Sequence, residues 1–126
     1  MPTNIKIIHS GEFIRATPEG HLDFAETKKL LIEIANASIA GPLDDYEVIL
    51  DTRKAHSELT VANLYDLVSE LGKFRKTFKR KMAVICPLAQ FNNTEFFALC
   101  AQNRGFQVSA FTSFAEAWWR WEDRLL

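Results

Sequence analysis

The densest group of polar side chains in the sequence separates a short apolar run at 48–50 from an amphipathic pattern that begins at 61. This segment, residues 51–60, leaves an expected strand and enters the head of an expected helix. In open α/β sheets ligands bind at the carboxyl ends of the strands, and free N–H groups at a helix N-terminus favour anions. We therefore predict that the segment binds a protein partner or a ligand through Asp51, Arg53, His56, Ser57 and Thr60.

Both ends of this segment also have a purely structural interpretation. Asp51 is of a type that makes a local side-chain turn. Thr60 is a good N-cap for the helix that follows it, and capping explains this threonine without any partner.

Side chains that would support catalysis do not converge in the sequence. His9, His21 and His56 lie far apart, with neither metal-ligand spacing nor a nearby cysteine pair. The chain has no glycine-rich phosphate loop and no Gly-x-Ser-x-Gly motif. Cys86, at the end of an expected strand, is placed like a nucleophile, but buried cysteines are common and ordinary burial is the better explanation. We expect a protein that is not an enzyme and has no metal and no cofactor.

Residues 73–81 form a strongly basic run, whereas residues 1–72 carry 12 acidic and 6 basic side chains. Together with Phe74 and Phe78, the run is a candidate for peripheral contact with anionic lipid headgroups. The alternative is a solvated helix end and strand edge. The basic patch consists of Lys73, Arg75, Lys76, Lys79, Arg80 and Lys81.

Three tryptophans fall in the last helical pattern of the chain. At about 100° per residue, Trp118 and Trp121 share a side with Phe114, which indicates burial. Trp119 points elsewhere and is a candidate contact in a homodimer or with a partner. The alternative is that Trp119 lies partly buried on the sheet rim. The sequence leaves monomer and homodimer open.

Length and composition are those of an ordinary globular protein. The 126 residues, 48% of them hydrophobic, predict a single domain over residues 1–126. The net charge of −1 and the pI of about 6.3 exclude a globally basic nucleic-acid binder, so we expect no nucleic-acid partner. No apolar run approaches the roughly 18 residues of a membrane span. Two cysteines make no disulfide framework, and we expect a cytoplasmic protein.

Hydrophobic periodicity and capping signals predict the element order ββαβαβαβα. Strands are expected at 5–8, 12–16, 46–51, 81–86 and 106–111. Helices are expected at 23–37, at 60–72, from Asn93 or Thr94 to about residue 103, and from Ser113 onward. A hairpin followed by alternating strands and helices predicts an α/β fold. Its mixed sheet has parallel later strands that are joined by right-handed crossovers and covered by four helices.

This order and several local motifs resemble the SpoIIAA-like family of small bacterial STAS-type proteins. The similarity covers about residues 5–121 and implies the STAS/SpoIIAA-like fold. Its motifs are Val-Ile-Leu-Asp-Thr-Arg at 48–53, Leu-Thr at 59–60, Ala-Val-Ile at 83–85, Asn-Arg-Gly-Phe-Gln-Val at 103–108, and Phe111 followed by Ala-Glu-Ala-Trp-Trp at 115–119.

The resemblance also implies functions. In the anti-sigma factor antagonists of that family, an Asp-Ser-Ser-Gly-like sequence at the helix start carries the serine that a partner kinase phosphorylates. Here Thr60 falls on the phosphoacceptor position, Leu59 replaces the Asp and Ala62 replaces the Gly. The implied function is a cytoplasmic regulatory module with a protein partner. The family is also grouped with lipid-binding CRAL-TRIO domains, which implies an alternative: binding or carrying an apolar, lipid-like small molecule.

Overall fold

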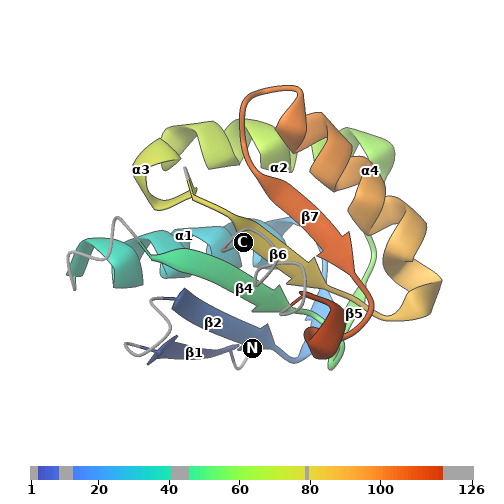
Figure 1. Cartoon of the computed structure of the whole chain (residues 1–126). Helices are drawn as coiled ribbons and strands as arrows, with labels where there is room; N and C mark the ends of the chain where they lie inside the picture. The colour runs from blue at the N-terminus through green and yellow to red at the C-terminus, as the bar shows by residue number, and fades with distance from the viewer. Residues whose placement is uncertain (1–2, 9–12, 41–45, 79, 118–126) are drawn as a thin grey trace.

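The computed structural model describes residues 3–8, 13–40, 46–78 and 80–117, and Figure 1 shows their arrangement. A helical turn at 114–117 follows the last strand. The elements before it are β1 (Thr3–Ile8), β2 (Phe13–Pro18), β3 (Gly20–Leu22), α1 (Phe24–Ala40), β4 (Glu47–Asp51), β5 (Ala55–Ser57), α2 (Val61–Lys73), α3 (Arg75–Phe78), β6 (Met82–Ile85), the 3-10 helix η1 (Leu88–Gln90), α4 (Phe91–Gln102) and β7 (Val108–Phe111).

The main sheet has the strand order β1-β2-β4-β6-β7. β1 pairs antiparallel with β2, and every other neighbouring pair is parallel. The predicted α/β fold with a mixed sheet is thereby confirmed. Each parallel connection passes through one of the helices α1, α2 and α4, since a parallel pair needs a crossover. The carboxyl ends of β4 and β6 therefore lie at the same end of the sheet as the start of α2.

The three long helices cover one face of the sheet. One buried cluster joins side chains of α1, α2 and α4 to strand residues such as Val48, Leu50 and Val84. Because successive strand residues point to opposite faces, Ile49 and Ile85 belong to a second, smaller cluster on the other face, together with Phe13, Phe111 and Ala117. The near-continuous apolar strands are thus explained by burial on both faces.

Two predicted helix boundaries have the expected hydrogen bonds. At the head of α2, the Asn63 N–H donates to Thr60 Oγ1 (3.1 Å) and the Thr60 N–H donates to Asn63 Oδ1 (3.0 Å), which is a reciprocal capping box. After α4, Gly105 has φ +91°, its N–H donates to the carbonyl of Gln102, and the next N–H donates to that of Ala101. This is the glycine-terminated Schellman motif, which the sequence predicted as a left-handed cap.

Other boundaries differ from the prediction. α4 begins at Phe91 and not at Asn93 or Thr94, because η1 precedes it directly and the Thr94 hydroxyl donates to the Gln90 carbonyl within the helix (3.0 Å). β3 and β5 form a separate two-stranded parallel sheet, and α3 is a single turn. Segments of three or four residues are too short for a periodic pattern, so the sequence did not indicate them. Trp118, Trp119 and Trp121 lie outside the described residues.

Candidate functional site

Segment 51–60 lies at the carboxyl end of the parallel strands, as predicted. It leaves β4 at Asp51, forms β5, and enters α2 after Thr60. Its candidate side chains do not share one environment. Asp51 is buried, with 4% of its surface exposed, and Ser57 is half-buried. Arg53, His56 and Thr60 are exposed.

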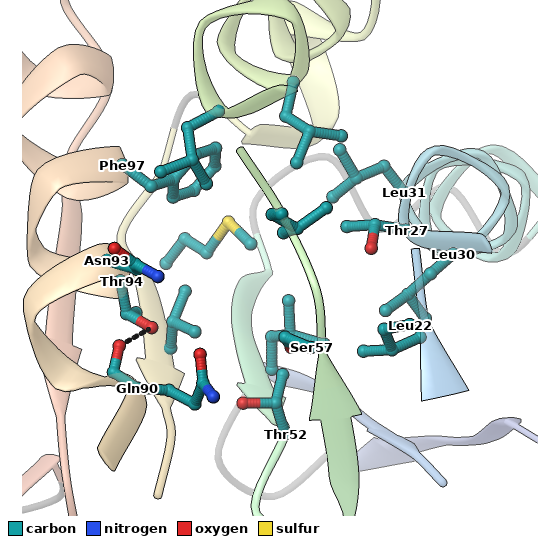
Figure 2. A pocket seen from close by; sticks show the side chains of 16 residues that line it. Leu22, Thr27, Leu30, Leu31, Thr52, Ser57, Gln90, Asn93, Thr94 and Phe97 are labelled. Carbon is teal, nitrogen blue, oxygen red and sulfur yellow. Dashed lines mark hydrogen bonds between the residues drawn. The ribbon is translucent and has the colours of Figure 1, made fainter. Parts of the chain in front are cut away.

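Next to this segment, an apolar cavity of about 70 Å³ lies between the helices and the sheet (Figure 2). Leu30 and Leu31 of α1 line one side of it, and Asn93 and Thr94 of α4 line the other. Segment 51–60 contributes to the wall as well, through Thr52, Ser57 and Leu59. Ser57 is therefore directed to the cavity and differs in this respect from Arg53, Thr60 and His56.

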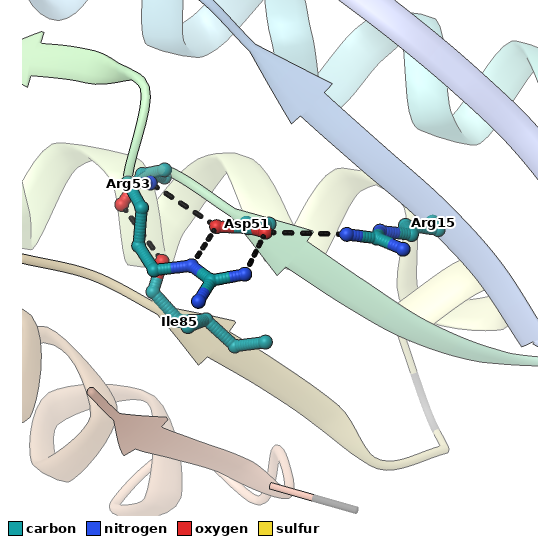
Figure 3. A network of polar contacts seen from close by, with 5 residues as sticks. Arg15, Asp51, Arg53 and Ile85 are labelled. Carbon is teal, nitrogen blue, oxygen red and sulfur yellow. Dashed lines mark hydrogen bonds and ion pairs between the residues drawn. The ribbon is translucent and has the colours of Figure 1, made fainter. Parts of the chain in front are cut away.

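On the opposite face of the sheet, Asp51 binds two arginines (Figure 3). The Nε and Nη2 of Arg53 donate to its two carboxylate oxygens at 2.9 and 2.8 Å, and the backbone N–H of Arg53 donates to Oδ1 at 3.1 Å. Arg15 of β2 donates to Oδ2 from the other side at 3.4 Å, and its guanidinium lies 5.1 Å from the centre of the Phe114 ring. The carboxylate thus fixes the first turn after β4.

The charge of this carboxylate depends on its arginines. Burial raises the pKa of Asp51, but the hydrogen bonds and positive charge of Arg53, together with Arg15, outweigh burial and hold that pKa below its usual value of 3.8. In return, the hydrogen bond from Asp51 raises the pKa of Arg53. Asp51 is therefore ionised and internal. Its part in the segment is to hold Arg53 in place, and only Arg53 of this pair reaches the surface.

The short sheet of β3 and β5 brings together two histidines that are far apart in the sequence. His21 and His56 are register partners, and their rings lie 6.1 Å apart. Glu58 lies 3.7 Å from Nε2 of His21 and 3.6 Å from Nε2 of His56. From the sequence we did not expect these two histidines to meet, because no pattern indicated the pairing of β3 with β5. Over residues 3–8, 13–40, 46–78 and 80–117, no three histidine, cysteine or acidic side chains are arranged to hold a metal ion.

The start of α2 exposes two large apolar side chains. Val61 is 57% exposed and Tyr65 is 50% exposed, and the Tyr65 ring meets that of Phe96 edge-on at 5.6 Å. We call Val61, Tyr65 and Phe96 the α2 patch. In the sequence, Val61 and Tyr65 share the i, i+3, i+4 rhythm of Leu64, Val68 and Leu71, which predicts that all five lie on the buried side of the helix. For Val61 and Tyr65 that prediction is wrong: Leu67 joins Leu64, Val68 and Leu71 on the buried side, so the centre of that side lies away from Val61 and Tyr65.

Thr60 acts as the N-cap of α2, which confirms its capping interpretation. We expect Thr60→Ala to lower the free energy of unfolding by about 1 kcal/mol, because it leaves the N–H of Asn63 without its side-chain acceptor. Urea denaturation followed by circular dichroism measures this loss. Thr60→Ser and Thr60→Asp retain an acceptor and should remain within a few tenths of a kcal/mol of the parent. A loss of the same size in Thr60→Ser would contradict the capping role.

The basic patch lies at the other end of the sheet, where α2 ends and β6 begins. Lys73 binds Glu70 (3.0 Å), and the Arg75 guanidinium lies 4.6 Å from the centre of the Phe106 ring.

Phe78 is 1% exposed and belongs to the main core, so its predicted place in a lipid-contacting surface is wrong. Phe74 is half-buried against the same core. Arg80 is exposed and Lys81 half-buried, while the side chain of Lys76 and all of Lys79 lie outside the described residues.

Cys86 is buried, and its Sγ lies 3.6 Å from the carbonyl oxygen of Phe111. Burial raises the pKa of its thiol above the ordinary value, despite a hydrogen bond with Thr94. Since the thiolate is the reactive form, we expect iodoacetamide at neutral pH to label the partly exposed Cys100 at least tenfold faster than Cys86. Peptide mass spectrometry of timed samples measures the two rates. Faster labelling of Cys86 would restore the interpretation of this residue as a nucleophile.

Within the described residues, no helix combines the length and the apolar character that crossing a bilayer requires. A scan against protein-family models finds no match for the chain, and a search of the curated proteins finds none either.

The fold itself is that of a known structural class, the SpoIIAA-like fold, as the resemblance in the sequence indicated. The similarity is to the crystal structure of an uncharacterized protein of the DUF3478 family from Shewanella loihica PV-4, which has a SpoIIAA-like fold. The TM-score is 0.59, and the match covers 92% of this chain and 89% of that chain. The two sequences are 14% identical, so the similarity establishes the fold and no more.

Proposed function

We propose that the protein is a non-enzymatic regulatory module of the STAS type that binds a protein partner through segment 51–60 and the start of α2. The observation that carries this proposal is the exposure of Val61 and Tyr65 directly after a segment with exposed polar side chains. Large apolar side chains on a helix usually face the core, and an exposed group of them beside polar residues is typical of a protein–protein contact.

The charges around the α2 patch support the same proposal. The exposed cations Arg53 and Lys54 lie at the start of segment 51–60, whereas the charged residues nearest to the patch in the sequence are acidic: Glu58, Asp66 and Glu95 are exposed. Their acidic side chains suit a partner that presents apolar side chains flanked by basic ones, because complementary charges increase association rates and select among partners. Thr60 lies beside the patch, so a phosphate on its hydroxyl would add about two negative charges to this surface. We propose Thr60 as the site of such a switch.

Affinity capture from an extract of the cells that make the protein tests this proposal. The bait is the full chain, compared with a Val61→Asp/Tyr65→Asp variant. Ala25→Asp/Asn36→Asp is the matched control, because it adds the same two charges at exposed positions of α1. We expect one protein to be captured by the parent and by the control but not by the α2-patch variant. Equal capture by all three baits, or by none, would contradict the proposal.

A second arm of the same experiment addresses segment 51–60. The side chain of His56 is exposed, and so are its ion-pair partner Glu58 and its ring neighbour His21, so His56→Ala should leave the fold intact. The proposal predicts that this variant binds the captured protein more weakly. Unchanged affinity would remove segment 51–60 from the binding surface and leave the α2 patch alone.

The second candidate function, binding of an apolar ligand, is supported by the cavity next to segment 51–60. Its volume of about 70 Å³ is well below the 300–1,000 Å³ of ordinary small-molecule sites. This function therefore requires a short ligand or movement of the cavity wall. Native mass spectrometry of the purified protein tests it. A bound mass that is lost in Val84→Ile, which adds a methylene group to the wall, would support the function, and an unliganded parent would oppose it.

A further inference from the structure

β7 is the last strand of the main sheet, and its outer edge carries backbone groups that point away from the sheet. The N–H of Met82 donates to the carbonyl of Gln107, just before β7, and that of Cys86 donates to the Phe111 carbonyl, so both carbonyls face β6. Backbone direction alternates along a strand, and Val108 and Ala110 therefore present their N–H and C=O groups outward. The side-chain amide of Gln102 confirms this direction, because its Nε2 donates to the Val108 carbonyl (2.8 Å).

Little on β7 protects this edge. Proteins commonly block exposed strand edges with lysine, proline or a bulge. β1, at the opposite edge of the sheet, carries the exposed Lys6. β7 has the sequence Val-Ser-Ala-Phe, and its central residues, Ser109 and Ala110, are small and at least partly exposed. The side-chain amide of Gln102 already binds the outward carbonyl of Val108. The outward N–H and C=O groups of Ala110 are flanked by the small side chains of Ser109 and Ala110, so another strand can approach them.

A surface groove of about 400 Å³ runs over this edge. Leu99 of α4, which is 52% exposed, supplies an apolar wall on the helix-covered side. The charged residues that line the groove are Lys81, Glu95 of α4 and Glu116. Lys81 comes immediately before β6, level with the start of β7, and Glu116 follows the end of β7. The groove thus has a basic group at one end of the strand and an acidic group at the other.

We propose that this edge pairs with the same edge of a second copy of the chain, β7 against β7 in antiparallel orientation, and joins the two sheets into one. A two-fold axis perpendicular to the strands makes the pairing antiparallel and self-complementary. It places the start of one β7 beside the end of the other, so Lys81 of each copy faces Glu116 of the second copy. The arrangement buries both Leu99 side chains and uses neither Val61 nor Tyr65, although Glu95, beside the α2 patch, also lines the groove.

Sedimentation of the full chain over a range of concentrations, with three variants, tests this dimer. The parent should dimerise. Lys81→Glu alone and Glu116→Lys alone should each weaken dimerisation by roughly tenfold or more, because each change turns two attractive contacts into repulsive ones. An equimolar mixture of the two variants should dimerise as the parent does, since the heterodimer has both attractive contacts again. Lys29→Glu, at an exposed position of α1, is the matched control and should dimerise normally.

A fourth variant tests the backbone pairing itself. Ala110→Pro removes an outward N–H that does not serve the pairing with β6, so the variant should keep the circular dichroism spectrum of the parent and become monomeric. The proposal is overturned if the parent is monomeric at every concentration. It is also overturned if a dimer forms that neither charge reversal weakens, or if mixing the two reversed variants fails to restore it.

Discussion

Replacing Phe78 with alanine should lower the free energy of unfolding by about 3–5 kcal/mol. Phe78 is 1% exposed and is the largest of the fully buried side chains of the protein's described residues. Phe78 lies in the main core, on the side of α3 that faces the other helices, and both α1 and α2 contact α3. Truncation removes the transfer free energy of the ring and leaves a cavity that the surrounding helices fill only in part. Urea denaturation followed by circular dichroism measures the loss.

A change beside Phe78 provides the control for this experiment. Arg75→Ala removes an exposed guanidinium that stacks on Phe106, and an exposed cation–π contact contributes about 0.5–1 kcal/mol. The two variants alter the same short helix, yet their effects should differ by a factor of three or more. A loss below about 1 kcal/mol for Phe78→Ala would show that Phe78 is at the surface, where the basic patch would regain an aromatic contact for lipid.

Asp51→Ala should be the most destabilising change in segment 51–60, at about 2–3 kcal/mol. The carboxylate accepts hydrogen bonds from both arginines and from the Arg53 N–H. Its removal leaves two guanidinium groups without their acceptor on a half-covered face of the sheet. The loss stays below that of a fully buried ion pair, because the arginine side chains are 37% and 41% exposed and regain water. Urea denaturation at neutral pH gives the value.

The same carboxylate should make stability depend on pH. The pKa of Asp51 is lower in the folded protein than its usual value of 3.8, so the folded state binds this proton less readily than the unfolded state. The stabilisation that the ionised Asp51 carboxylate provides is therefore present above about pH 4 and is lost as the pH falls through the folded-state pKa of Asp51. Asp51→Asn cannot ionise, so the stability difference between parent and variant should shrink in acid. A difference that stays constant from neutral pH to about pH 3 would contradict this assignment.

Local signals in the sequence were sufficient for most of the fold. Thr60 and Gly105 are recognisable because each satisfies helix backbone groups within a few residues of itself. The β3–β5 pairing has no such local signal. It joins two three-residue segments whose contacts are more than 30 positions apart, and it brings His21 to His56 only through tertiary structure. Pairings of this kind depend on the packing of the whole domain.

The candidate site was predicted in position but not in detail. The strand-to-helix transition at Asp51 indicated the correct end of the sheet, yet Arg15, 36 positions earlier, has no pattern that links it to Asp51. Val61 and Tyr65 fit the helical rhythm of a buried face, and only the location of Leu67 shows that they lie at its margin. In the basic run, the spacing of the aromatic residues did not reveal that Phe78 turns inward through α3.

Site-specific photo-cross-linking tests most directly whether the start of α2 is the surface of contact with a partner. The photoreactive residue p-benzoylphenylalanine replaces Tyr65, which already carries an exposed ring, and replaces Asn36 of α1 in a matched control. Irradiation of the cells that make the protein should yield one covalent adduct with another protein from position 65 and none from position 36. The same adducts from both positions, or no adduct from position 65, would contradict the account.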